Sequence, residues 1–221
     1  MSFHNFVTYL IKTTFLGLVV TSFTANAQDL QIKSINLSQD NMNTEFKILL
    51  PPNEYNFLPT LHKKGLHNGI DVTLYRYQPE GKFVLDHQHV SILQNDKGKL
   101  EGFVRLLPQY KVSGKQVSKD KAKNIAMNFL QRFAPDLVDK YKVNWIDEHT
   151  EEILVNNEKT IISGMKVKCR NERDGLYFWV VIAPDESVMI FERDIEWDFL
   201  RTGRKTEKWL HDNWLVNVNI P

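Results

Sequence analysis

One amphipathic segment, residues 118–133, constrains the fold more than any other part of this sequence. Ser118 is a good N-cap because its hydroxyl can accept a hydrogen bond from a free backbone N–H, and Asp120 in the first turn suits the helix dipole. Pro135 ends the helix because proline cannot continue it. Apolar residues recur at helical spacing, so one face has to pack against another element. These residues are Ala122, Ile125, Ala126, Phe129, Leu130 and Phe133.

Strand patterns follow this helix. Alternating or fully apolar runs predict strands at 143–147, 160–170, 176–183 and 188–198. A helix followed by a strand meander is typical of an α+β fold. We therefore expect two layers, with antiparallel β-sheet meanders packed on one main amphipathic helix.

The first half of the chain is expected to be rich in β-strands. Residues 110–117 contain Ser113-Gly114-Lys115 and resemble a linker, which divides the chain into a β-rich half, 28–112, and an α+β half, 113–221. The sequence leaves open whether the two halves form one sheet or two domains. Strands in the first half are expected at 70–77, 83–93 and 99–106.

Residues 1–27 have the pattern of a secretory signal peptide. Lys12 is their only charged residue, an apolar stretch of about 11 residues follows it, and Ala25-Asn26-Ala27 offers small residues for cleavage after Ala27. About 20 apolar residues are needed to cross a bilayer, so we expect cleavage, no membrane span in the product, and a periplasmic or secreted location. With 28 Lys and Arg against 27 Asp and Glu, no charge excess points to nucleic acid.

The sheet face opposite the helix is the first candidate site. We expect it to stay open and to bind a partner protein, with the aromatic residues as anchors between two charged rows. A solvated sheet face and a calcium site on the acidic row are the alternatives. The residues are Lys166, Lys168 and Arg170 in the basic row, Tyr177 and Trp179 in the middle, and Glu192, Asp194 and Glu196 in the acidic row.

Other residues could carry chemistry. His87 and His89 would share a strand face, as two metal ligands would, with Glu101 as the nearest third ligand; a polar strand row without metal is the alternative. Cys169, the only cysteine, falls on the face predicted to be buried, where a thiol is inert. His211-Asp212 could do acid–base chemistry but has no identifiable nucleophile. We therefore expect neither an enzyme nor a cofactor.

Several segments resemble a known family. The run Val117–Ala122, with Ile125-Ala126 and Phe129-Leu130, is similar to the helix opening of PepSY domains, and 164–197 resembles their sheet. Residues 75–100 are similar to propeptides of thermolysin- and fungalysin-type metalloproteases. The resemblance implies a PepSY/cystatin-like fold and a non-catalytic, extracytoplasmic role in peptidase inhibition, propeptide-like chaperoning or ligand sensing. No HExxH domain follows here, so any protease it controls would be a separate protein.

The sequence thus predicts an exported, non-catalytic, PepSY-like protein that engages or inhibits another protein, such as a peptidase. The alternative is a small-molecule or metal carrier that uses the face bearing His87 and His89. A hydrolase with Cys169 as its nucleophile is the third hypothesis.

Overall fold

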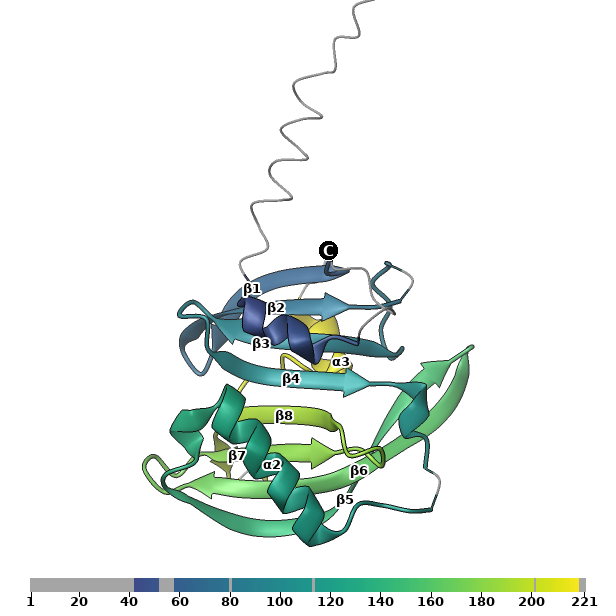
Figure 1. Ribbon diagram of the computed structural model, residues 1–221. Coiled ribbons are helices and arrows are strands. Elements are labelled where there is room, and N and C mark those ends of the chain that lie inside the picture. Colours follow the sequence, from purple (N-terminus) through teal and green to yellow (C-terminus); the bar gives the residue numbers. More distant parts are fainter. Residues whose placement is uncertain (1–41, 52–57, 80, 113, 201, 219–221) are drawn as a thin grey trace, which may run out of the picture. The chain divides into compact units, whose positions relative to one another are not determined.

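The computed structural model describes residues 42–51, 58–79, 81–112, 114–200 and 202–218, and the predicted signal peptide, 1–27, lies outside them. Eight strands form one antiparallel sheet in the order β1-β2-β3-β4-β8-β7-β6-β5 (Figure 1). These strands are β1 (Leu61–His67), β2 (Ile70–Tyr77), β3 (His89–Asn95), β4 (Leu100–Leu106), β5 (Tyr141–Val155), β6 (Glu158–Asn171), β7 (Tyr177–Ile182) and β8 (Val188–Ile195). Short 3-10 helices are η1 (Thr44–Leu49), η2 (Pro108–Tyr110), η3 (Pro135–Leu137) and η4 (Val216–Val218).

The predicted amphipathic helix is confirmed as α2 (Lys119–Phe133). The Ser118 hydroxyl accepts from the backbone N–H of Lys121 at 3.3 Å, as an N-cap does. Phe129 packs between Phe103 of β4 and Phe191 of β8, with ring centroids 6.4 and 5.4 Å away. Helix α2 therefore lies on one face of the sheet and contacts β5, β6, β7 and β8.

The predicted α+β class is wrong. The protein is mostly β: an eight-stranded antiparallel sheet dominates it, and α2 is the only helix of seven or more residues in the part of the chain that the structure describes. Helical periodicity located α2, but it could not tell how much sheet lies beyond the helix. No helix among the described residues has the length and apolar character needed to cross a membrane.

One sheet joins the two halves of the chain. Strand β4 pairs with β8 through Gly102↔Glu192, Phe103↔Phe191 and Val104↔Ile190. The segment that resembled a linker runs along the same sheet, since Lys111 forms a bridge with Ile162. The open question of one sheet or two is therefore answered in favour of one.

Three predicted strands have different bounds in the structure. The hairpin of β5 and β6 is much longer than the expected strands at 143–147 and 160–170, and it turns at Asn156 and Asn157, both with positive φ. Asparagine tolerates this conformation, which two-residue hairpin turns require. Strand β3 begins at His89 rather than at residue 83, because the preceding residues form turns and Asp86 has a positive φ of 61°.

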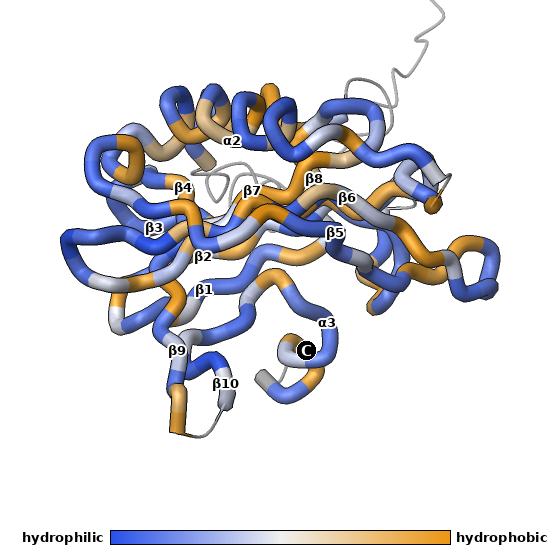
Figure 2. Tube along the Cα trace, turned by 90° about the horizontal axis from the view of Figure 1, so that it is seen from below, coloured by the Kyte–Doolittle hydropathy of each residue, from blue (hydrophilic) through white to orange (hydrophobic). Residues whose placement is uncertain are grey.

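The C-terminal segment, residues 196–218, covers part of the second face of the sheet. It contains β9 (Trp197–Asp198), β10 (Gly203–Arg204) and α3 (Asp212–Leu215). Figure 2 shows α2 on one side of the sheet and β9, β10 and α3 on the other. The prediction that this face stays open is therefore wrong where the segment lies, and the strand patterns of the sheet could not reveal it.

Two glycines allow the close approach of this segment. A Cβ at Gly65 of β1 would lie 2.4 Å from the ring of Trp209, and one at Gly102 of β4 would lie 2.7 Å from a methyl group of Leu210. Trp209 also donates its indole N–H to the backbone oxygen of Leu66 at 2.8 Å. Arg76 pairs with Asp212, and Arg204 pairs with Glu192, which ties the segment to the sheet at two points.

We predict that Gly65→Ala destabilises the protein by about 1–3 kcal/mol, because the added methyl group has to displace the buried Trp209 ring. Urea unfolding followed by tryptophan fluorescence measures this change. Lys64→Ala, at an exposed neighbouring position, is the control and should change stability by less than about 0.5 kcal/mol. Equal stability of the two variants would contradict the packing of Trp209 on β1.

Candidate functional site

A partly exposed cluster of rings and lysines lies on the second face of the sheet, where strands of the sheet meet the start of the C-terminal segment. We call it the aromatic–lysine surface; at its centre, the Lys168 ammonium lies 4.7 Å from the ring centre of Tyr177, 5.4 Å from that of Trp197 and 5.6 Å from that of Trp145. These distances permit cation–π attraction to all three rings. The surface comprises Trp145, Lys166, Lys168, Tyr177, Trp197 and Phe199.

Strand register creates this cluster. Lys168 of β6 lies directly opposite Trp145 of β5 and Trp179 of β7, so the three side chains share a face. Trp197 then reaches the same lysine from β9. Four strands therefore contribute to one surface.

Three of the four rings of this surface are exposed. Trp145 is 43% exposed, Trp197 37% and Phe199 72%, and Leu200 beside them is 97% exposed. Phe199 also packs edge-on against Tyr177, with 6.5 Å between ring centroids. Contiguous exposed apolar side chains of this kind are typical of an interaction site.

The two lysines have reduced contact with water. Burial lowers the pKa of Lys166 to about 8, and burial also lowers the pKa of Lys168. The Lys166 ammonium lies 4.0 Å from the ring centre of Trp179. Neither lysine makes a salt bridge within the described residues, so a carboxylate of a partner would stabilise their charges.

Two of the predicted binding residues are not accessible. Trp179 is 7% exposed and Glu192 is 4% exposed. Burial alone would raise the pKa of Glu192, but the Arg204 guanidinium and the His211 imidazole outweigh it and hold the pKa well below its usual range. Trp179 is therefore not a surface anchor, and Glu192 belongs to the internal contacts of the C-terminal segment.

Asp194, Glu196 and Arg170, which belong to the two predicted charged rows, each contact a different residue of the protein. Asp194 accepts from Arg193 Nε at 2.9 Å, and Glu196 pairs with Lys205 at 2.8 Å. Arg170 is exposed, and its Nε donates to the backbone oxygen of Gly175 at 3.1 Å. The acidic row is thus divided among internal partners, which removes the reason to expect calcium there.

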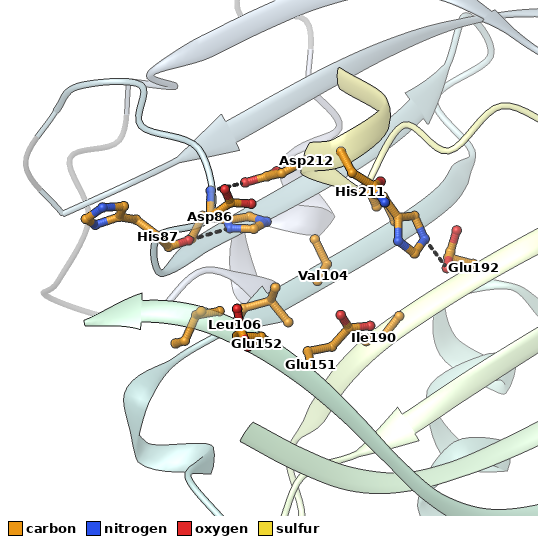
Figure 3. Close-up of a pocket in the computed structure, with 14 residues that line it drawn as sticks. Asp86, His87, Val104, Leu106, Glu151, Glu152, Ile190, Glu192, His211 and Asp212 are labelled. Atoms are coloured by element: carbon orange, nitrogen blue, oxygen red, sulfur yellow. Dashed lines mark hydrogen bonds and ion pairs between the residues drawn. The ribbon is translucent and has the colours of Figure 1, made fainter. Parts of the chain in front are cut away.

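The structure does not arrange the predicted histidine pair as two ligands of one metal ion. His89 is 2% exposed, and its Nδ1 lies 2.9 Å from the backbone oxygen of His87. The His87 ring points away from the other labelled residues (Figure 3). Glu101 accepts from Asn95 instead, and it lies five residues along β4 from Leu106, which pairs with His89. No group of three or more His, Cys, Asp or Glu side chains within the described residues is arranged to hold a metal ion.

A pocket of about 100 Å³ lies beside His89, between β5 and the C-terminal segment. In Figure 3, Glu151 and Glu152 of β5 lie across the pocket from His211 and Asp212. The His211 Nε2 donates to Glu192 at 3.1 Å. The sequence singled out His211-Asp212, but it could not show that the two face different partners.

A network of one buried arginine and three acidic residues lies near η3, which follows helix α2. The Arg193 guanidinium donates two hydrogen bonds to Asp136, at 3.0 and 2.6 Å, and also faces Asp194 and Glu101. Glu101 is the most distant of the three acids, at 3.7 Å, and is 3% exposed. Burial raises the pKa of Glu101 to about 7, although Arg193 opposes the shift. One guanidinium thus faces three carboxyl groups, and Glu101 is the one that holds a proton most readily.

Comparison with protein-family models, curated proteins and solved structures found no match to this chain. The resemblance to PepSY domains and protease propeptides therefore stays a prediction. The site rests on geometry alone.

We predict that the free energy of unfolding of the wild type falls between pH 4.5 and pH 7, and that Glu101→Gln makes this fall smaller. The unfolded chain ionises Glu101 near its ordinary pKa of 4.5, whereas the folded protein keeps the proton to about pH 7. The folded state binds more protons in this window, so its stability falls as the pH rises. The neutral glutamine should remove about 2 kcal/mol of this fall.

Urea unfolding at pH 5 and pH 7 measures the difference for the wild type and the variant. Glu172→Gln, the same substitution at an exposed position, should keep the wild-type dependence on pH. If Glu101→Gln kept it as well, the protonation assigned to Glu101 would be wrong.

Proposed function

We propose that this chain is an exported, non-catalytic binding protein that holds another protein at its aromatic–lysine surface. The observation that carries the proposal is the placement of Lys168 among three rings from separate strands, with Trp145 and Trp197 accessible. Exposed tryptophan and tyrosine side chains are the residues that most often dominate the energy of binding a protein.

The surface favours a partner segment with both apolar and acidic side chains. Apolar groups would cover Trp145, Trp197 and Phe199, and a carboxylate would pair with Lys168, whose salt-bridge capacity is unused among the described residues. Displacing water from this lysine on binding would strengthen such a pair, since the surrounding rings already limit its hydration. The resemblance to PepSY domains makes a peptidase a reasonable partner.

The proposal assigns no catalytic role to Cys169. Its side chain is 1% exposed, and burial raises the pKa of the thiol to about 12. A nucleophilic cysteine needs access to substrate and a thiolate near neutral pH. Cys169 has the surroundings of a core residue.

Export is part of the proposal because of residues 1–27. Their apolar stretch and the Ala25-Asn26-Ala27 site have the pattern of a cleaved signal peptide. The single cysteine leaves no internal disulfide to form in an oxidising compartment, so packing has to supply the stability there.

We predict that a photoreactive phenylalanine analogue at Trp197 captures one protein partner in cells that produce this chain. The same analogue at Asn124, exposed on α2 at the opposite face of the sheet, is the matched control and should not capture that partner. Mass spectrometry of the crosslinked product identifies the partner and the peptide in contact.

A charge reversal tests the surface in the same assay. Lys168→Glu should weaken binding by about 2 kcal/mol or more and remove the crosslink at Trp197, because the reversed charge repels a partner carboxylate. Lys168→Arg, which keeps the cation, should retain most of it. Capture that is equal at Trp197 and Asn124, or unaffected by Lys168→Glu, would contradict the proposal.

A further inference from the structure

His89 presents one buried hydrogen-bond acceptor without a protein partner. Its Nδ1 lies 2.9 Å from the backbone oxygen of His87, and a carbonyl oxygen can only accept, so Nδ1 carries the proton. The other ring nitrogen, Nε2, is therefore an acceptor in the neutral ring. It is buried and makes no hydrogen bond to another group among the described residues. Leaving such an atom unpaired is costly, and His89 lines the pocket described above.

The pocket carries more negative charge than its neighbours neutralise. Five carboxylates line it, and two of them, Asp86 and Glu151, have no salt bridge to a lysine or arginine within the described residues. Among the described residues Glu151 accepts from His149, at 2.8 Å, and its charge also acts on the more distant Lys166. The other three carboxylates are paired, as Arg76–Asp212, Arg204–Glu192 and Lys159–Glu152.

The remaining walls are partly apolar, with the polar residues His87, His211 and Asn213 among the aliphatic side chains, and the space is small. Five aliphatic side chains line the pocket, and its volume of about 100 Å³ corresponds to roughly three water molecules, or a few methylene and amine groups. A ligand that fits has a hydrogen-bond donor, a positive charge and a short apolar part. The aliphatic side chains are Val104, Leu106, Ile153, Ile190 and Leu210.

We propose that this pocket binds a primary alkylammonium group, with His89 Nε2 accepting one of its N–H groups and Glu151 and Asp86 supplying the opposite charge. A metal ion fits less well, because the described residues contain no set of three His, Cys, Asp or Glu side chains arranged around one point. The site adjoins the aromatic–lysine surface, since the charges of Glu151 and Glu192 act on Lys166. The sequence predicted a carrier site at His87 and His89. The site proposed here uses His89 with Glu151 and Asp86 instead.

The test is an NMR titration of the wild-type protein, with the ring nitrogens of His89 observed directly. Propylammonium should shift the Nε2 resonance of His89 in a saturable way, because Nε2 gains a hydrogen bond. Propanol, which has a donor but no charge, should bind at least about 10-fold more weakly, and propionate should not bind. A shift of equal size and midpoint with propanol, or no shift with propylammonium, would overturn the proposal.

Two further arms make the result specific. Glu151→Gln removes one unpaired charge and should weaken propylammonium binding by about 3- to 10-fold, whereas Glu158→Gln, exposed at the tip of the same hairpin and outside the pocket, should leave it unchanged. Equal effects of the two variants would overturn the charge assigned to Glu151.

A blocked lysine, Nα-acetyl-lysine methylamide, distinguishes two sources of the alkylammonium group. Tighter binding than propylammonium indicates a lysine of another protein, and weaker binding indicates a free amine. Stoichiometric binding of Zn²⁺ at His89 in place of the amine would contradict the proposal.

Discussion

The docking of the C-terminal segment on the second face of the sheet is the contact on which the rest of the structure depends. Two ion pairs with little access to water, Arg76–Asp212 and Arg204–Glu192, hold it there. Buried charges of this kind are not a large net source of stability, but loss of one partner would leave the other uncompensated, at a cost of about 3–5 kcal/mol. The pairs therefore fix the position of the segment more than they strengthen the fold.

This position divides the second face into three parts. Over β1 to β4 the segment fills the space with Trp209 and Leu210, which make a closed core there. At its edge, near β5, it leaves the small acidic pocket. Near Lys168 the β9–β10 hairpin contributes Trp197, and there Trp145 and Trp197 stay partly exposed. One packing arrangement thus creates both candidate sites.

Local patterns in the sequence predicted individual elements well and their assembly poorly. Helix α2 was predictable because capping at Ser118 and apolar spacing are local properties. The pairing of β4 with β8 was not, since it joins residues about 90 positions apart and antiparallel strands carry no code for a distant partner. For the same reason Trp145 was missed: its importance comes from lying opposite Lys168, and that register depends on the turn at Asn156-Asn157. Trp179 was placed on the correct strand, but strand alternation could not show that Lys166 of β6 and Arg204 of the C-terminal segment lie against its ring.

The most direct measurement of this arrangement is hydrogen exchange of the Trp209 indole N–H, which donates to the backbone oxygen of Leu66. If the C-terminal segment is an integral part of the fold, this proton should exchange only on global unfolding, with the same free energy as the backbone amides of β4 and β8. The indole N–H of Trp197, a residue that is 37% exposed, is the reference for fast exchange in the same spectrum. Exchange of the Trp209 proton as fast as that of Trp197, while β4 and β8 stay protected, would show that the segment does not close the sheet.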